Sequence, residues 1–285
     1  MTSEVNSTNR WRAIVSRMTT EFGAMLKSLR AARRMSQLQL ATEAEVSTRH
    51  LSFLETGRAR PSREMVLVLA SMLDLPLRDR NLLLECAGFA SAYRETRLEA
   101  PELRDVRQAI EIILRQHEPF PAMVLDRHWN LRMVNRGFSR AHQVMTGGTL
   151  IAPYQLVPSP APNLMRLFFA PDGYRPFLRN WSDVVRDLLP RLMREASADP
   201  EARPLVDELM AMPGVPRLRD ALVHAPVVLP VELSFGGLHA RLFTTITTLG
   251  TAQDVTLQEL RIEALHPADE DSRAVVTALL GSPPS

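Results

Sequence analysis

Residues 36–61 constrain the fold of this chain more than any other stretch. They contain two short segments with helical spacing of apolar residues, and each segment follows a serine, Ser36 or Ser47. A serine in this place can cap a helix because its hydroxyl accepts a hydrogen bond from a free first-turn amide. Leu51 and Leu54 mark the inward face of the second segment at i, i+3 spacing. The pattern predicts two short helices joined by a tight turn, which is the arrangement of a major-groove DNA reader.

Each of the two predicted helices has an inward and an outward face. In the first helix we expect Leu38, Leu40 and Ala41 to face inward. In the second, the first turn is polar and basic and is expected to point outward; its residues are Thr48, Arg49 and His50. The plain alternative is that these are solvated residues on a helical bundle.

Basic side chains follow the second helix and gather in this part of the chain. Arg58, Arg60 and Arg63 suit contacts with phosphates, which position a protein on DNA without reading its sequence. Residues 1–97 hold 15 basic and 10 acidic side chains, whereas the remainder holds 19 and 22. The positive charge therefore lies with the predicted DNA reader, as phosphate binding requires.

About residues 20–90 resemble the phage-repressor-like helix-turn-helix family, usually called XRE. The matching positions agree in register and are Arg30, Ser36-Gln37, Leu40-Ala41, Val46-Ser47, Leu51, Leu54-Glu55, Gly57-Arg58 and Pro61-Ser62. The resemblance implies an all-α, lambda-repressor-like domain. It also implies that an arginine before the motif pairs with a glutamate at the end of the recognition helix. We predict this ion pair between Arg30 and Glu55, with a structural rather than a DNA-reading role.

The same resemblance implies which residues contact DNA. Gln37 would touch a phosphate or a base near the edge of the half-site. Thr48 and Arg49 would reach base edges, and arginine most often binds guanine O6 and N7. Phe53 would meet a thymine methyl group or pack on the neighbouring helix. The full set expected at the DNA is Gln37, Ser47, Thr48, Arg49, His50, Ser52, Phe53, Arg58, Arg60 and Arg63.

The length of 285 residues allows two domains, each with its own core. Residues 1–18 are expected to be an N-terminal extension. Helical patterns over 21–34, 62–74 and 77–87 complete a five-helix domain over 19–90. A linker is expected over 91–104, a second domain over 105–270 and a tail over 271–285. An amphipathic helix at about 101–117 links the domains, contributes to a dimer or lies on the second domain's sheet.

The period of the pattern changes after residue 119. Residues 123–125 and 131–134 flank a polar turn and predict a β-hairpin. Helices are expected over 136–145, 163–170, 181–196 and 201–212, and strands over 227–234, 238–248 and 256–264. A hairpin, then helices, then an antiparallel meander is the order of an α+β, PAS-like sensor domain, in which a small ligand can lie between sheet and helices.

Three segments carry a second resemblance. PAMVLDRHWNLRMVN, NLMRLFFAPDGYRPFLRNW and the late strand hairpin are similar to the ligand-binding domain of MmyB-like regulators. That family joins one such domain to an XRE-type head and has been linked to fatty-acid-type ligands. The resemblance covers about 105–270. The segment HAPVVLPVELSFGGL keeps only the strand pattern of the family.

Methionine and aromatic side chains are frequent in the second half. Methionine adapts its shape and suits a pocket for flexible chains, although such residues can equally fill a core. The residues expected to line a pocket are Met133, Phe138, Phe168, Phe169 and Trp181. Those that could meet a carboxylate head group, by their place near the hairpin, are Arg136, Arg140 and His142.

Motifs of other protein classes are not found in the sequence. Its seven histidines show no metal-ligand spacing with another histidine, a cysteine or a carboxylate, so no metal is expected. No phosphate loop or nucleophile elbow is present, and we expect no enzyme and no cofactor beyond a lipid-like effector. Cys86 alone excludes an internal disulfide, and the longest apolar run, residues 65–75, is too short for a bilayer. No signal peptide is recognised either, and a soluble cytoplasmic protein without a membrane partner is expected.

Together these features predict a dimeric bacterial transcription regulator that binds a palindromic double-stranded operator. Its second domain would sense an apolar or amphipathic, fatty-acid-like small molecule. The alternative is a second domain that serves only dimerisation or protein interaction. An enzyme with a DNA-binding head is a third reading, for which the sequence offers no catalytic group.

Overall fold

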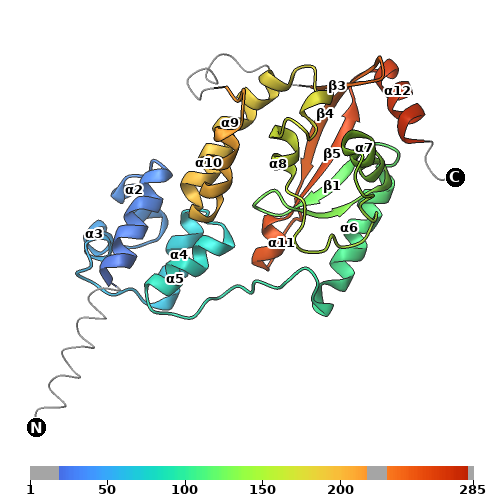
Figure 1. Ribbon diagram of the computed structural model, residues 1–285. Helices are drawn as coiled ribbons and strands as arrows, with labels where there is room; N and C mark the ends of the chain where they lie inside the picture. Colours follow the sequence, from blue (N-terminus) through green and yellow to red (C-terminus); the bar gives the residue numbers. More distant parts are fainter. Residues whose placement is uncertain (1–18, 217–229, 282–285) are drawn as a thin grey trace, which may run out of the picture. The chain divides into compact units, whose positions relative to one another are not determined.

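The structure, a computed structural model, describes residues 19–216 and 230–281 (Figure 1). The chain divides into two compact units. Unit 1 comprises Met1–Thr96 together with Thr251–Gln258, and unit 2 comprises Arg97–Gly250 together with Glu259–Ser285. The expected N-terminal extension, 1–18, lies outside the described residues.

The helices predicted for the five-helix domain over 19–90, called the head below, form in unit 1. They are a helix over 19–32, α2 (Gln37–Glu43), α3 (Thr48–Glu55), α4 (Arg63–Met72) and α5 (Leu77–Cys86). Ser36, Ser47 and Ser62 cap α2, α3 and α4, because each hydroxyl accepts a hydrogen bond from a backbone amide of the first turn. The helix starts that serines signal in the sequence are therefore the helix starts of the structure.

Tight packing fixes α3 in unit 1. Leu51 and Leu54 of α3 are fully buried, as is Phe22 of the preceding helix. Gly23 lies so close to the end of α3 that a Cβ atom there would come within 2.5 Å of the Leu54 carbonyl oxygen. The expectation for Leu38 was wrong, since 64% of it is exposed. Leu40 and Ala41 form the buried face of α2. Leu38 lies two positions before Leu40, and in a helix this spacing points a side chain away from that face.

A short segment from late in the chain completes unit 1. Val255–Glu259 form helix α11, so the strand expected over 256–264 begins later than predicted. The Asp254 carboxylate is buried and accepts hydrogen bonds from the amides of Thr96 (3.0 Å) and Thr256 (2.9 Å). The Gln258 side chain accepts another from the amide of Leu77 at 2.6 Å. These contacts within unit 1 outweigh the β propensity of the segment, as tertiary packing often does.

Unit 2 contains a five-stranded antiparallel sheet with the order β2-β1-β5-β4-β3. The strands are β1 (Ala122–Leu125), β2 (Leu131–Val134), β3 (Val231–Phe235), β4 (Leu238–Thr247) and β5 (Arg261–Pro267). The predicted hairpin is thus confirmed as β1 and β2. Of the strand expected over 227–234, residues 227–229 lie outside the described residues. β5 is the central strand, with β1 on one side and β4 on the other.

The other described elements of unit 2 are helices. They are η1 (Pro101–Leu103), α6 (Arg104–Gln116), α7 (Arg136–Thr146), α8 (Leu164–Phe169), η2 (Arg175–Phe177), α9 (Trp181–Ala198), η3 (Pro200–Ala202), α10 (Arg203–Ala211) and α12 (Glu270–Leu280). Of these, α6, α7, α8 and α12 lie close to the sheet (Figure 1). α12 occupies the segment expected as a tail. It forms because Asp269 caps its first turn at the Ser272 amide (2.7 Å) and because Val276 and Leu280 are buried.

The amphipathic helix α6 belongs to unit 2. Ile110 and Leu114 are buried, and His117 directly after it has its Nε2 atom 2.8 Å from the carbonyl oxygen of Leu265 in β5. The helix therefore packs against the sheet domain, one of the three roles open from the sequence. Within the described parts of the chain, no helix combines the length and the apolar character that crossing a membrane requires.

Candidate DNA interface and ligand cavity

The outward side of α3 carries the side chains predicted to read DNA. Ser47 accepts a hydrogen bond from the His50 amide at 3.1 Å and thereby holds the first turn. Arg49 is exposed, and its guanidinium lies 5.3 Å from the centre of the Phe53 ring, one turn later. A cation over an aromatic face is attracted to it. Phe53 thus packs beneath Arg49 and helps to hold that arginine at the helix surface.

The other predicted arginines are also open to solvent. Arg58, Arg60 and Arg63 are exposed, while Thr48 and Ser52 are half-buried. Over the described residues, Arg49 and these three arginines form no ion pair with a carboxylate within 4.0 Å. Their charges remain available for an anionic partner, which is what phosphate contact requires.

The predicted pair of Arg30 and Glu55 forms behind this surface. Two parallel contacts join the guanidinium to the carboxylate, Nε to Oε1 at 2.6 Å and Nη2 to Oε2 at 2.9 Å. The Arg30 Nη1 atom also donates to the Met35 carbonyl oxygen at 2.7 Å. Gln37, expected at the DNA, donates from Nε2 to Glu55 Oε2 at 2.7 Å. In this structure Gln37 is therefore part of the scaffold behind α3.

Glu55 is ionised in this environment. Only 1% of its side chain is exposed, and burial by itself raises the pKa of a carboxyl group. The hydrogen bonds from Arg30 and Gln37 and the charge of Arg30 outweigh burial and hold the pKa of Glu55 below its ordinary value. The carboxylate thus fixes the end of α3 to the helix over 19–32 and to the start of α2.

Unit 2 contains a cavity of about 400 Å³ between the sheet and helices α7, α8 and α9. This volume lies in the range of small-molecule sites, about 300–1,000 Å³. Most of its lining is apolar. The lining residues are Pro121, Met123, Trp129, Phe138, Ala141, Met145, Leu164, Met165, Phe168, Tyr174, Leu178, Val184, Asp187, Leu188, Arg191, Val231, Leu233, Leu242, Thr244, Ile246, Glu263 and Leu265.

Two of the predicted lining residues, Phe138 and Phe168, lie in this wall. Phe169 and Trp181 are buried directly behind it, with their ring centres 6.4 Å apart. Met133 faces a different hollow beside α6. The ligand-binding roles expected for Phe169, Trp181 and Met133 therefore have no support from the cavity lining.

The three residues expected near a head group do not line the cavity either. Arg136 lies with its guanidinium 5.8 Å from the centre of the Tyr154 ring. Arg140 donates to the Leu280 carbonyl oxygen. His142 is buried, and its Nδ1 atom is 2.7 Å from the hydroxyl of Tyr174, which does line the cavity. Burial lowers the pKa of His142, so a neutral imidazole orients the Tyr174 hydroxyl.

A cluster of charged side chains around Trp129, at the cavity wall, was not predicted from the sequence. Two guanidinium groups lie over the Trp129 ring, with Arg261 at 4.0 Å and Arg191 at 4.8 Å from its centre. Its Nε1 atom donates to Glu195 Oε2 at 2.9 Å, and both arginines pair with Glu195 Oε1 at 3.2 Å. The aromatic residue in the predicted polar turn was the one sequence signal for this arrangement.

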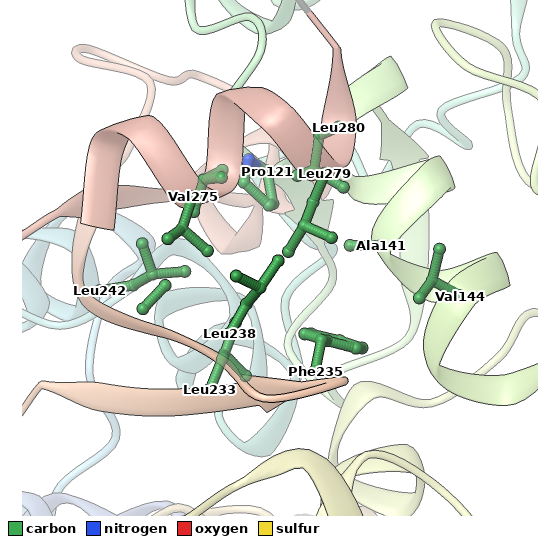
Figure 2. A pocket seen from close by; sticks show the side chains of 12 residues that line it. Pro121, Ala141, Val144, Leu233, Phe235, Leu238, Leu242, Val275, Leu279 and Leu280 are labelled. Atoms are coloured by element: carbon green, nitrogen blue, oxygen red, sulfur yellow. The ribbon is translucent and has the colours of Figure 1, made fainter. Parts of the chain in front are cut away.

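A second hollow in unit 2 is too small for a ligand. Figure 2 shows it between α12, α7 and the hairpin of β3 and β4, with Leu279, Val144 and Leu238 among its apolar side chains. Its volume is about 30 Å³, which is close to the share of one water molecule in the liquid. The 400 Å³ cavity is therefore a better candidate for a small-molecule site than this hollow.

One group of potential metal ligands comes together in the described residues of unit 2. The ligand atoms of His128, Asp199 and Glu201 lie within 4.8 Å of one another. Arg127 pairs with both carboxylates, and His128 Nε2 is 2.8 Å from Asp199 Oδ2. Because the Arg127 guanidinium already engages both carboxylates, this cluster is an ion-pair network at the surface.

Comparisons with known proteins agree with this division of the chain. Residues 21–83 match a helix-turn-helix domain, and residues 106–279 match the MmyB-like transcription regulator ligand binding domain. No curated protein sequence matches the chain.

Two solved structures resemble parts of the chain. The restriction-modification controller protein C.AhdI from Aeromonas hydrophila is 31% identical, over 22% of this chain and 94% of its own, with a TM-score of 0.21. The clp gene regulator ClgR from C. glutamicum is 34% identical, over 25% of this chain and 90% of its own, with a TM-score of 0.22. The two domain matches, rather than these low TM-scores, carry the assignment. The chain belongs to the MmyB-like transcription regulators, as a DNA-binding regulator with a helix-turn-helix head and a PAS-like α+β ligand-binding domain.

Proposed function

We propose that an amphipathic small molecule, bound in the 400 Å³ cavity, controls how this regulator engages its operator. The cavity carries the proposal, because it lies inside the domain of the ligand-binding family and is walled by apolar side chains with a few polar groups. That composition is typical of small-molecule sites. The ligand can change operator binding only by as much as it prefers one arrangement of the protein over another.

The regulator acts as a homodimer on a palindromic operator in this proposal. A single α3 helix reads one half-site, and two half-sites about 34 Å apart match a two-fold dimer. Arg49 reads a guanine in each half-site, supported by Phe53 beneath its guanidinium. Arg58, Arg60 and Arg63 contact phosphates and carry no base preference.

Replacing Arg49 by alanine tests the reading helix. We expect operator binding to weaken by about 1–3 kcal/mol and discrimination to relax at one base pair, because a bidentate contact to guanine is lost. Binding titrations against single-base operator variants measure both effects. Arg60→Ala should instead weaken binding to all sequences alike and lower the salt slope by about one. Arg97→Ala, which removes an exposed arginine outside the helix-turn-helix, is the control. An Arg49→Ala protein with unchanged base preference contradicts the assignment.

Filling the cavity tests the sensing role. Leu188 lines the cavity from α9 and is half-buried. In Leu188→Trp the larger ring occupies ligand space, so a co-purifying ligand seen by native mass spectrometry in the wild type should be lost. Ligand affinity measured by calorimetry should fall at least tenfold. Ile112→Trp, at a position 51% exposed on α6, should leave both unchanged.

The outcomes of this experiment separate the two classes of function. A ligand retained at full affinity in Leu188→Trp contradicts binding in this cavity. A wild-type protein that binds no small molecule, yet remains dimeric, favours a second domain that serves dimerisation alone. The resemblance to the family suggests a fatty-acid-like ligand. Binding its carboxylate in the cavity would require an ion pair with a basic side chain of the lining.

A further inference from the structure

Glu263 lies in the middle of the sheet and in the wall of the cavity. It belongs to the central strand β5, opposite Met123 of β1 and Ile246 of β4, and both of these neighbours also line the cavity. Only 7% of Glu263 is exposed. A carboxyl group is thus placed among apolar side chains, facing a space large enough for a ligand.

The Glu263 carboxyl group has no protein partner in the described residues. It forms no hydrogen bond and no ion pair within 4.0 Å there. The two nearby cations, Arg191 and Arg261, both pair with Glu195 and lie over the Trp129 ring, while the Nε atom of Arg261 is itself buried without a hydrogen-bond partner. A buried polar group without a partner is costly and calls for an explanation.

The charges in the wall favour a cation over an anion in the cavity. One basic and two acidic side chains line it, namely Arg191, Asp187 and Glu263, which gives a formal charge of −1. Glu195 and Arg261 lie next to them and cancel each other. Burial raises the pKa of Glu263, and the charges of Arg261 and Arg191 only partly oppose this. An ammonium group beside Glu263 would supply the missing donor and the missing positive charge.

We propose that Glu263 is the specificity-determining residue of the cavity and that the ligand is an amphipathic amine, with its ammonium group on Glu263 and its apolar body along α7 and α8. This inference rests on the proposed function, since it names the class of ligand for the same cavity. It replaces the fatty-acid-like ligand, because a carboxylate would face Glu263 with the same charge. Phe138 and Phe168 offer aromatic surface to the apolar body.

Three probes of equal chain length test the proposal on the full-length protein, namely decylamine, decanol and decanoic acid. Calorimetric titrations below the micelle concentration of each probe give the affinities. For the wild type we expect decylamine to bind at least tenfold more tightly than decanol, and decanoic acid to bind most weakly. Glu263→Gln should remove the preference for the amine over the alcohol while retaining decanol binding. Glu232→Gln, on β3 and outside the cavity lining, should behave as the wild type.

The stability of the variants checks the folded state independently. Glu263→Gln and Glu263→Leu should melt at or above the wild-type temperature without ligand, because both remove a buried carboxyl group that forms no hydrogen bond within the protein. An unchanged amine preference in Glu263→Gln, or tightest binding of decanoic acid by the wild type, overturns the amine proposal and leaves the cavity as the ligand site. Failure of all three probes to bind, with no co-purifying molecule, overturns the proposed sensing function itself.

Discussion

Replacing Glu55 by alanine is expected to destabilise unit 1 by about 3–5 kcal/mol, the cost of removing one partner from a buried ion pair. The substitution leaves the Arg30 guanidinium, whose side chain is 12% exposed, without its carboxylate. Gln37 loses its acceptor as well. Because a domain is stable by only about 5–15 kcal/mol, operator binding should be lost at growth temperature. Denaturant unfolding followed by circular dichroism measures the change.

The control for this experiment is Glu43→Ala, which removes an exposed glutamate from α2. It should change the free energy of unfolding by no more than about 0.5 kcal/mol, as surface substitutions usually do. If Glu55→Ala unfolded at the same denaturant concentration as the control, the pair would not be a structural element of the head.

Acid provides an independent test of the same pair. The pKa of Glu55 in the folded protein lies below its ordinary value of 4.5, so the folded state binds this proton less readily than the unfolded state. The stabilisation is fully present above pH 4.5 and is lost as the pH falls through the lowered pKa. The side chain in Glu55→Gln cannot titrate. The free energy of unfolding of this variant should therefore fall less than that of the wild type as the pH drops below 4.5.

Trp129→Ala is expected to cost unit 2 about 3–5 kcal/mol, the usual range for removing a large buried aromatic side chain. Trp129 is 3% exposed. Its loss removes the surface on which Arg191 and Arg261 stack. It also removes the indole N–H that donates a hydrogen bond to the Glu195 carboxylate. Thermal unfolding and near-ultraviolet circular dichroism of the full-length protein measure the effect.

Trp129→Phe separates the ring from the indole N–H. It keeps an aromatic face for the two arginines, but it loses part of the buried ring and the hydrogen bond to the Glu195 carboxylate, which contributes about 1.5–3 kcal/mol. We therefore expect Trp129→Phe to be less destabilised than Trp129→Ala. Equal losses in the two variants would show that the stacking of the guanidinium groups on an aromatic ring contributes nothing to stability.

The head could be predicted from the sequence because its signals are local. Ser36 and Ser47 start the helices they were expected to start, and Leu51 and Leu54 are buried at the predicted spacing. Cap residues and short apolar periods act within one or two helical turns, and therefore they can be read without knowing the rest of the chain. The α+β order of the second domain followed from the change of period for the same reason.

The cavity could be predicted only in outline. Arg261, Glu263 and Leu265 alternate with Ile262 and Ala264 along β5, and a period of two assigns charged residues to the solvent face. In the structure, helices α7, α8 and α9 cover that face, which buries Glu263. No sequence period reports which face a distant helix will cover. α11 was missed for a similar reason, since Asp254 just before it contacts Thr96 and Gln258 within it contacts Leu77, and both contacts join residues far apart in the chain.

The position of Thr251–Gln258 within unit 1 makes the head a discontinuous domain. The chain passes between the two units at residues 96–97, 250–251 and 258–259. A fragment that ends at Thr96 therefore lacks the acceptors that Asp254 and Gln258 give to Thr96 and Leu77. In a hybrid regulator, this head could not be exchanged as one uninterrupted piece of gene, because a remote segment must travel with it. Residues 251–258 lie in the chain between β4 and β5, which both line the cavity, so the segment that completes the head cannot be separated in the gene from the strands of the cavity wall.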